Sequence, residues 1–269
     1  MRERDLRFVE SRIDLLRRRD RERDSESRKV EAEVFDEATL MAIYHLFSSG
    51  VIDTIEFPIS TGKEAVVFTA RTSNPPPALP DAEWLAVKIY RITNAEFRNL
   101  YRYIDGDPRF DNVRRDLRSI ILAWARKEHK NLVRARDAGV SVPAPVAIRR
   151  NILVMEVVLD GERVAPMLKD APPDDPGAFF VEVLESMRRL HRGARLVHAD
   201  MSEYNILVSD GHPVLIDMGQ AVVLEHPGAA EFLRRDAENL GRVFSRMGVD
   251  ADPDAIMGFI TGGRGAGSG

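Results

Sequence analysis

The stretch LVHADMSEYNILV, Leu196 to Val208, decides the fold that the sequence predicts. It places a histidine, an aspartate and an asparagine between two short apolar runs. Asn205 follows Asp200 by five positions, and Asp217 follows Asp200 by 17 positions. The runs NILV and VLID, separated by the turn sequence SDGHP, predict a β-hairpin that brings Asp217 back toward the other two residues. Three oxygen-bearing side chains would therefore converge at one end of this hairpin.

This spacing is typical of phosphoryl transfer. In that chemistry one carboxylate accepts or orients the proton of the attacking group, while an amide oxygen and a second carboxylate hold magnesium on the nucleotide phosphates. The alternative is that Asp200 and Asn205 only cap a turn and Asp217 only ends a strand, because Asp and Asn favour such positions.

A lysine within an apolar strand sequence gives a second indication. Lys88 lies in LAVKIYR, and an ammonium group inside such a strand needs an anionic partner because a buried unpaired charge is costly. Glu128, in WARKEHKNL on the following long predicted helix, is the best candidate to orient Lys88 toward nucleotide phosphates. The alternative is that the ammonium group of Lys88 reaches water from an edge strand.

The segment ISTGKEAVVF lies between the first two predicted strands, where a phosphate-binding loop is expected. It has one glycine and matches neither G-x-G-x-x-G nor the Walker A pattern. Ser60 and Lys63 nevertheless offer a hydroxyl and an ammonium beside backbone N–H groups in a tight turn, all of which suit phosphate oxygens. An ordinary hairpin turn remains the alternative.

Elsewhere the pattern predicts a strand-rich first part and a helix-rich second part. Asp36 is a suitable helix N-cap, and Gly50 stands where that helix would end. Runs rich in β-branched and aromatic residues predict strands over 51–59, 64–71, 84–91, 146–150 and 152–159, of which the first three are antiparallel. Helical patterns cover 93–137, with an interruption at 105–112, and cover 178–191 and 229–247.

Composition excludes several classes of protein. The 269 residues are 44% hydrophobic and 30% charged, and no apolar run approaches the roughly 20 residues that span a bilayer. The arginine-rich start lacks the features of a secretory signal, so we expect a soluble, cytoplasmic protein without a membrane partner. Zero cysteines exclude disulfides, zinc–thiolate sites and cysteine nucleophiles.

The charge pattern bears on nucleic acids. A net charge of −4 gives no global attraction to them, and no DNA partner is expected. Five arginines between Arg17 and Arg23 form a local basic cluster with interleaved acids. Residues 1–30 are interpreted first as a solvated helix of mixed charge, and second as a contact for RNA or an acidic partner.

Together these motifs resemble the RIO family of atypical serine/threonine kinases, most closely its Rio1 branch and of archaeal type. The resemblance rests on STGKEA, AVKIYR, WARKEHKNL, LVHADMSEYNILV and IDMGQAV followed by HP, and it covers roughly 34–247. The sequence departs from the family at Val66, Phe68 and Met218, none of which would bind phosphate or metal.

The resemblance implies a fold and an order of domains. The fold is of the α+β class: a two-lobed protein-kinase-like fold with an antiparallel β-sheet in the N-lobe and a mostly helical C-lobe, lacking the activation loop and the peptide-docking subdomains. The expected division is a charged helical extension over 1–33, an N-lobe over 34–157, a C-lobe over 158–260 and a disordered tail over 261–269.

The resemblance also implies roles for single residues. Asp200 is the catalytic carboxylate, Asn205 and Asp217 are the Mg²⁺ ligands, and Asp217 is also a candidate acceptor of the γ-phosphate of ATP in an ATPase cycle. The groups expected to bind ATP are the side chains of Ser60, Lys63 and Lys88, the last oriented by Glu128, and the backbone of Glu156 and Val158. The implied partner is the precursor of the small ribosomal subunit, its rRNA and its proteins, with an unknown protein acceptor.

Two other functions share part of this pattern. A small-molecule phosphotransferase of the aminoglycoside or choline kinase type has the same H-x-D-x4-N and D-x-G arrangement, although STGKEA and the small C-terminal part argue against it. A non-catalytic assembly factor that binds nucleotide only to set its shape is the second alternative. The presence of every expected residue does not by itself establish turnover.

Overall fold

The computed structural model describes residues 1–13, 34–92, 101–110 and 113–262. Contacts divide the chain into two compact units, which are described separately. Unit 1 comprises residues 1–101, 112–129 and 144–157, and unit 2 comprises residues 102–111, 130–143 and 158–269. The arginine cluster of the N-terminus, the predicted helical start at 93–100 and residues 263–269 of the predicted disordered tail lie outside the described residues. The tail was predicted from 261, but Thr261 is the last residue of a helix.

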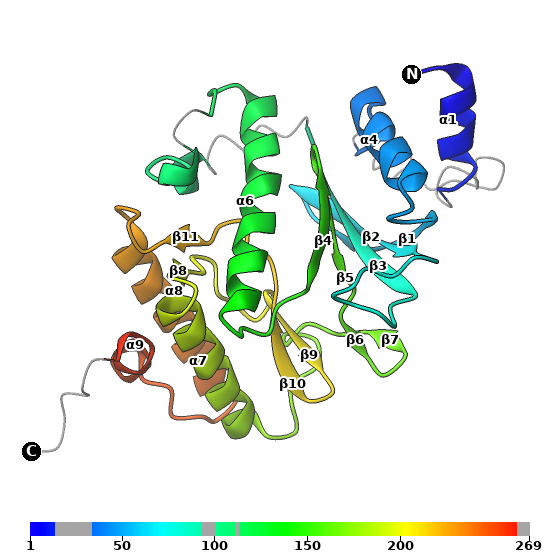
Figure 1. The fold of residues 1–269 in the computed structure, drawn as a ribbon. Helices are drawn as coiled ribbons and strands as arrows, with labels where there is room; N and C mark the ends of the chain where they lie inside the picture. The colour runs from blue at the N-terminus through cyan, green and yellow to red at the C-terminus, as the bar shows by residue number, and fades with distance from the viewer. Residues whose placement is uncertain (14–33, 93–100, 111–112, 263–269) are drawn as a thin grey trace, which may run out of the picture. The chain divides into compact units, whose positions relative to one another are not determined.

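Unit 1 is built on a five-stranded sheet in the order β1-β2-β3-β5-β4, in which all neighbours are antiparallel (Figure 1). This confirms the predicted antiparallel N-terminal sheet. The β-branched and aromatic residues of these segments favour the pleated, half-buried surface of a sheet. The strands are β1 (Thr54–Thr61), β2 (Ala65–Arg71), β3 (Trp84–Tyr90), β4 (Pro145–Arg149) and β5 (Ile152–Glu156).

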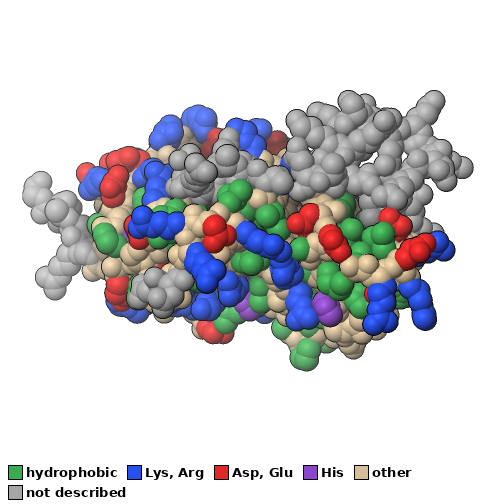
Figure 2. Space-filling view, turned by 90° about the horizontal axis from the view of Figure 1, so that it is seen from above, with side chains coloured by type: hydrophobic (Ala, Val, Ile, Leu, Met, Phe, Trp, Pro, Cys, Tyr) green, Lys and Arg blue, Asp and Glu red, His purple; other side chains and the backbone are tan. Residues whose placement is uncertain are grey.

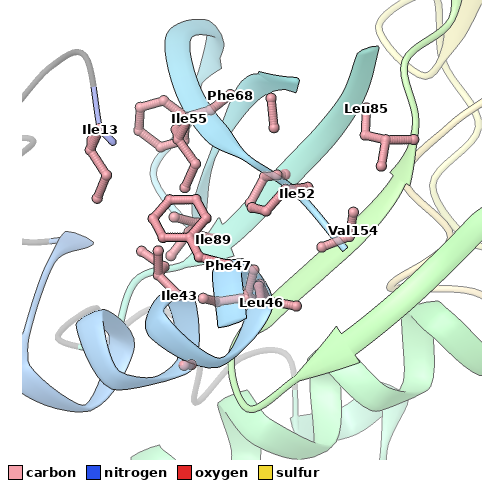
Figure 3. Close-up of a cluster of buried hydrophobic side chains, with 14 of the residues drawn as sticks. Ile13, Ile43, Leu46, Phe47, Ile52, Ile55, Phe68, Leu85, Ile89 and Val154 are labelled. Atoms are coloured by element: carbon pink, nitrogen blue, oxygen red, sulfur yellow. The ribbon is translucent and has the colours of Figure 1, made fainter. Parts of the chain in front are cut away.

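Two helices cover one face of this sheet. Helix α4 (Glu37–Ser48) begins as predicted at Asp36, whose carboxylate accepts a hydrogen bond from the Thr39 N–H group at 2.7 Å. Helix α1 (Glu3–Glu10) packs beside it. Side chains of both helices and of the sheet form one buried cluster, shown in Figure 3, in which Ile43 and Phe47 of α4 meet Ile55 and Phe68 of the sheet.

The N-terminal segment differs from a fully solvated helix. Val9 and Ile13 are completely buried in the core of unit 1, and Ile13 forms an isolated bridge with Ile55. Arg12 lies over the ring of Phe8 at 4.0 Å. Only Val9 and Ile13 of residues 1–13 are fully buried, so the charged composition of the segment gives no sign of them. A helix does form over Glu3–Glu10, but the interpretation of residues 1–13 as fully solvated is wrong.

Unit 2 contains most of the remaining helices. Helix α6 (Leu117–Asp137) starts in unit 1 and ends in unit 2, after the short 3₁₀ helices η2 (Tyr101–Tyr103) and η3 (Pro108–Phe110). Only η3 lies within the predicted interruption at 105–112. The prediction of α-helix is wrong for 101–104 and 113–116, because η2 is a 3₁₀ turn and α6 begins at Leu117. The helices of the second half are α7 (Pro176–Arg192), α8 (Ala229–Ser245) and α9 (Pro253–Thr261).

Helices α7 and α8 agree with the prediction, whereas α9 was not predicted. Helix α9 has an N-cap at Asp252 and proline in its first turn, which are ordinary start signals. It is nine residues long and precedes a run of glycines, so its pattern is weak beside those of the longer helices.

Short strand pairs complete unit 2. They are β6 (Leu159–Asp160) with β7 (Arg163–Val164), β8 (Leu196–Val197) with β11 (Val222–Val223), and β9 (Ile206–Ser209) with β10 (His212–Leu215). None of the helices within the described ranges combines the length and the apolar character that a bilayer span requires.

Candidate active site

The β9–β10 hairpin brings the two predicted metal ligands together. Its register pairs Ser209 with His212 and Ile206 with Leu215, so the strands run side by side to the open end. At that end the Ile216 N–H group donates a hydrogen bond to the Asn205 carbonyl at 3.0 Å. Asp217 is the next residue along the chain, and it is therefore held near the loop that carries Asp200.

Two amide groups hold the side chain of Asp200. Asn205 Nδ2 donates to the Asp200 carbonyl oxygen at 2.7 Å and to Asp200 Oδ2 at 3.2 Å. Gln220 Nε2 donates to the same Oδ2 at 2.9 Å. One oxygen of the carboxylate is thus held by the protein, whereas Oδ1 accepts no hydrogen bond from a described residue.

The backbone at the two motifs has an unusual conformation. Ala199 has φ of 67° and Asp217 has φ of 60°, in the left-handed region that non-glycine residues seldom occupy. Such conformations cost of order 1 kcal/mol or more and persist only where surrounding contacts impose them. Ala199 directly precedes Asp200, the predicted catalytic carboxylate. Asp217 is itself a predicted metal ligand.

Asp236 of α8 imposes the conformation on the loop. Its carboxylate accepts hydrogen bonds from the Ala199 N–H group at 2.7 Å and from the Met201 N–H group at 2.9 Å, on either side of Asp200. Asp236 is fully buried. Nearby, Arg235 donates to the Ala199 carbonyl, and Asn239 Nδ2 donates to the Met201 carbonyl at 3.0 Å.

No role was predicted from the sequence for these three residues of α8, which are Arg235, Asp236 and Asn239, or for Gln220. Asp and Arg are common on helices, and Asp236 lies 36 positions from Asp200, so no local spacing identifies it. Gln220 stands within the quoted motif IDMGQAV, and its place three residues after Asp217 was the signal that could have found it.

His198 connects the loop to the strand that leads to Asp217. Its Nε2 lies 3.1 Å from the Ile216 carbonyl oxygen, and the ring is fully buried. Burial lowers the pKa of His198, so the ring is neutral and Nε2 donates. This hydrogen bond ties the loop of Asp200 to the strand that leads to Asp217.

The electrostatics of the site raise the pKa of two carboxyl groups. Burial, followed by the negative charge of Asp217, raises the pKa of Asp200 to about 6. The hydrogen bond from Asn205 and the charges of Arg235 and Arg102 oppose this rise. Burial raises the pKa of Asp236 to about 7, against its two hydrogen bonds from the backbone. A carboxyl group with a pKa near 6 is matched to proton acceptance close to neutral pH.

Helix α6 supports the segment that contains Asp217. Asn131 is fully buried, and its Nδ2 donates to the carbonyl oxygens of Met218 and Ala221, both at 2.8 Å. Asn131 belongs to the motif WARKEHKNL but was assigned no role from sequence. Its two hydrogen bonds fix the chain on the C-terminal side of Asp217.

The predicted pair of Lys88 and Glu128 forms within unit 1. Lys88 Nζ lies 2.9 Å from both carboxylate oxygens of Glu128, and both residues are buried. Strand alternation places Lys88 on the face of β3 opposite Val87 and Ile89, which point into the core under α4. The Tyr90 hydroxyl also donates to Glu128, a contact that the sequence analysis did not predict.

The turn between β1 and β2 carries the other predicted phosphate contacts. The Gly62 N–H group donates to the Ala65 carbonyl at 2.9 Å and closes the turn. Lys63 is exposed on it, and Ser60 pairs with Val67 in the sheet. An added Cβ at Gly62 would stand 3.4 Å from the Ala65 oxygen, so a side chain there would meet the turn itself.

The backbone groups predicted to meet adenine differ in their present bonds. The Glu156 N–H group donates to the Ala144 carbonyl at 2.8 Å, so this N–H group is already used within unit 1. The Val158 carbonyl accepts from the Ala165 N–H group at 2.9 Å. The assignment of both residues to adenine binding stays a prediction.

The metal-binding prediction passes a test of donor chemistry. Because Asn205 Nδ2 faces Asp200, its Oδ1 points away and accepts no hydrogen bond from a described residue. Amide and carboxylate oxygens are hard ligands, and Mg²⁺ is usually held by one or two such groups together with phosphates and water. No cluster of three or more His, Asp or Glu suited to a metal occurs among the described residues.

The structure thus gathers Asp200, Asn205 and Asp217 in unit 2, and it pairs Lys88 with Glu128 in unit 1. Residues 66–256 match the RIO domain.

Relatives of the chain share most of its length. It is 48% identical to the RIO-type serine/threonine-protein kinase Rio1 of Haloferax volcanii, over 93% of this chain and 87% of that protein. It is 39% identical to the protein of the same name from Methanocaldococcus jannaschii, over 88% of this chain and 79% of that protein. It is 36% identical to human serine/threonine-protein kinase RIO1, over 84% of this chain and 39% of that longer protein.

Solved structures agree on the fold. Rio2 kinase from Chaetomium thermophilum has a TM-score of 0.61 at 18% identity and covers 91% of this chain and 80% of its own. A complex of Rio2 kinase from the same organism with ADP/Mg²⁺ and phosphoaspartate has a TM-score of 0.58 at 20% identity, over 82% and 69% of the two chains. The α+β kinase-like fold is therefore confirmed, and with the RIO domain and the Rio1 relatives it shows that this chain belongs to the RIO kinase family, in its Rio1 branch.

Proposed function

We propose that this protein is an ATP-dependent serine/threonine kinase that also hydrolyses ATP. The observation that supports this most strongly is the arrangement of Asp200, whose Oδ2 is held by Asn205 and Gln220 while Oδ1 is left for an acceptor. A residue that merely caps a turn needs neither a second amide donor nor the buried carboxylate of Asp236 behind it.

Each residue has a task in the proposed reaction. Asp200 orients the acceptor hydroxyl and takes its proton, which requires the ionised form of its carboxyl group. Lys88, oriented by Glu128, contacts the nucleotide phosphates. When bound, Mg²⁺ would neutralise phosphate charge, and Asn205 and Asp217 would hold it. Ser60 and Lys63 cover the phosphates, and the carbonyl of Glu156 and the N–H group of Val158 bind adenine.

The test follows the labelled phosphate. Purified protein is incubated with γ-labelled ATP and Mg²⁺, and free phosphate, labelled protein and added acceptors are measured. A kinase transfers label to serine or threonine of an added protein, whereas a small-molecule phosphotransferase labels a small acceptor. A protein that binds ATP but produces none of these products is an assembly factor without turnover.

Asp217 would also accept phosphate within the ATPase cycle. A carboxylate oxygen of Asp217 attacks the γ-phosphorus, the bond from that phosphorus to ADP breaks, and ADP leaves. Water then hydrolyses the acyl phosphate to inorganic phosphate and restores the carboxylate. In support, the Rio2 complex from Chaetomium thermophilum is named as containing ADP/Mg²⁺ and phosphoaspartate.

An acyl phosphate has distinctive chemistry that tests this step. The label should be labile to hydroxylamine and alkali, and borohydride should convert Asp217 alone to homoserine, which mass spectrometry identifies. Label that resists hydroxylamine and maps to Ser60 or Ser202 would replace this step with serine autophosphorylation.

The proposed partner is the precursor of the small ribosomal subunit, and the proposed location is the cytoplasm. The basic cluster of the N-terminal segment supports this proposal, together with the role that the resemblance to the RIO family implies. Deleting the whole segment is a poor test, because Val9 and Ile13 belong to the core of unit 1. Replacing the arginines between Arg17 and Arg23 by glutamine should instead weaken binding to purified particles and reduce its salt dependence. Unchanged affinity and salt dependence would contradict an RNA contact there.

A further inference from the structure

Two arginines beside the loop of Asp200 have no ion pair with a carboxylate of the described residues. Arg102, in η2, and Arg235, in α8, are near enough to Asp200 to oppose the rise of its pKa that burial and Asp217 cause. Neither forms an ion pair with any described residue, whereas the adjacent Arg234 pairs with Asp254 at 3.2 Å.

Aromatic rings and a phenol hydroxyl hold these two cations. Arg102 Nη2 donates to the Tyr103 hydroxyl at 2.8 Å, and Arg235 Nη2 lies 3.4 Å from the same oxygen. The guanidinium of Arg102 lies 4.7 Å from the ring centre of Tyr103, and that of Arg235 lies 5.2 Å from the ring centre of Phe232. The two rings pack at 5.2 Å, so they form one aromatic base beneath both cations.

This arrangement brings two positive charges together on a neutral base. Like charges repel by about 1 to 4 kcal/mol at 4 Å, depending on the surroundings. The charges of Asp200 and, at Arg235, of Asp236 oppose this repulsion without forming an ion pair with either arginine. An aromatic ring stabilises a guanidinium through its face and occupies none of the N–H donors. Several donors of both arginines therefore stay available to a bound anion.

The backbone of this part of η2 is fixed as well. His226 Nε2 lies 3.1 Å from the Arg102 carbonyl oxygen and 2.9 Å from the Asp105 carbonyl oxygen, and His226 Nδ1 accepts from the Gly228 N–H group at 3.0 Å. Because Nδ1 accepts, Nε2 carries the hydrogen and donates to η2. Gly106 packs so closely that an added Cβ would stand 2.9 Å from Pro227 Cδ. Arg102 is thus presented from a rigid segment even though it is exposed.

We propose that Arg102 and Arg235 form a subsite for a carboxylate side chain of the protein acceptor, close in sequence to the hydroxyl that receives phosphate. The inference rests on the proposed kinase function and names the class of its substrate: serine or threonine flanked by Asp or Glu. Arg235 bonds to the carbonyl of Ala199, one residue before Asp200, so the subsite lies beside the point where the acceptor hydroxyl must approach. The net charge of the protein is −4, and the face drawn in Figure 2 carries side chains of both signs. A preference for acidic peptides would therefore report a local site and not global attraction.

The test compares two peptides with one acceptor serine, flanked on both sides by two glutamates or by two glutamines. The wild-type protein should phosphorylate the glutamate peptide with a kcat/KM at least about fivefold higher at low salt. Raising the ionic strength should reduce this preference. Arg102→Gln should bring the ratio close to one, and Arg102→Lys should restore part of it. The matched control is Arg234→Gln, an exposed arginine on the same helix, which should leave the ratio and the turnover unchanged.

A second measurement keeps the inference testable if neither peptide is phosphorylated. Fluorescence anisotropy of both labelled peptides, with ADP and Mg²⁺ present, should show tighter binding of the glutamate peptide to wild type than to Arg102→Gln. Equal binding of the two peptides to wild type, or a preference that Arg102→Gln retains, overturns the subsite. Absence of all ATP turnover and phosphotransfer would refute the kinase proposal, and the anisotropy result would still decide this one.

Discussion

Glu128 holds the ammonium group of Lys88 symmetrically, with each of its carboxylate oxygens 2.9 Å from Nζ. The Lys88 side chain is 10% exposed and that of Glu128 is 1% exposed. A buried pair of this kind gives little net stability compared with apolar residues, but removing one partner leaves the other charge buried and unpaired. The pair is therefore better explained by orientation of the lysine than by stabilisation of unit 1.

Replacement of Glu128 by alanine should destabilise the protein by about 3 to 5 kcal/mol, because the charge of Lys88 stays buried without its partner. Urea unfolding measures the loss. The double variant Lys88→Met with Glu128→Leu should regain most of this stability and remain inactive. A double variant as unstable as Glu128→Ala would contradict the charge argument.

Replacement of Asp200 by alanine should abolish turnover and leave the affinity for ATP and Mg²⁺ within a few-fold of wild type, because in the proposed reaction Asp200 serves the acceptor and is not a ligand of the metal. A catalytic carboxylate typically contributes on the order of a hundredfold or more. Steady-state kinetics and isothermal calorimetry separate the two quantities. A variant that retained half of the wild-type rate would exclude Asp200 as the proton acceptor.

The pH dependence of turnover should report the pKa of Asp200, which burial and then Asp217 raise to about 6. The ionised form accepts the proton, so kcat/KM should fall about tenfold per unit as pH decreases below that value. Mg²⁺ at Asp217 offsets the charge that raises the pKa, so saturating Mg²⁺ should move this fall to lower pH. Measurement of kcat/KM against pH at low and at saturating Mg²⁺ tests the direction of this shift. If the fall in kcat/KM began at a higher pH with saturating Mg²⁺, the prediction would be contradicted.

Removal of the Asp236 carboxylate should disturb the loop around Asp200. Asp236→Ala leaves the buried N–H groups of Ala199 and Met201 without acceptors, at about 1 to 3 kcal/mol each. Turnover should fall as well, whereas substitution of the exposed Glu238 on the same helix should change neither quantity. Wild-type turnover in Asp236→Ala would show that the loop keeps its conformation without this support.

Asp236 should also make stability depend on pH. Burial raises its folded-state pKa to about 7, above the ordinary value near 3.9, so the protonated form is favoured by folding. Its contribution to stability is fully present below about pH 4 and is lost as pH rises through about 7. Asp236→Asn should lack this loss, so urea unfolding at several pH values should show wild type declining relative to the variant across that window.

Much of the fold and part of the site could be predicted from local sequence. The antiparallel strands follow from runs of β-branched residues, α4 follows from its N-cap at Asp36, and Asp200 and Asn205 lie on one loop. The pair of Lys88 and Glu128 was also predictable, because a lysine in an apolar strand needs an anion and the next helix offers one. The assignments of Asp200, Asn205 and Asp217 to catalysis and metal binding stay predictions.

The supports of the site depended on the tertiary structure. Asp236, Asn131 and Arg102 are common residue types that lie 36, 69 and 98 positions from Asp200, and no spacing in the chain distinguishes them from ordinary surface residues. They act because folding places a carboxylate beside two backbone N–H groups, an amide beside two carbonyls, and a guanidinium on an aromatic ring. The local sequence determined which residues could take part in phosphoryl transfer, because this reaction needs particular residue types at short, fixed spacings. The packing of distant segments decided which polar groups hold them, because a hydrogen bond depends on proximity in space and not along the chain.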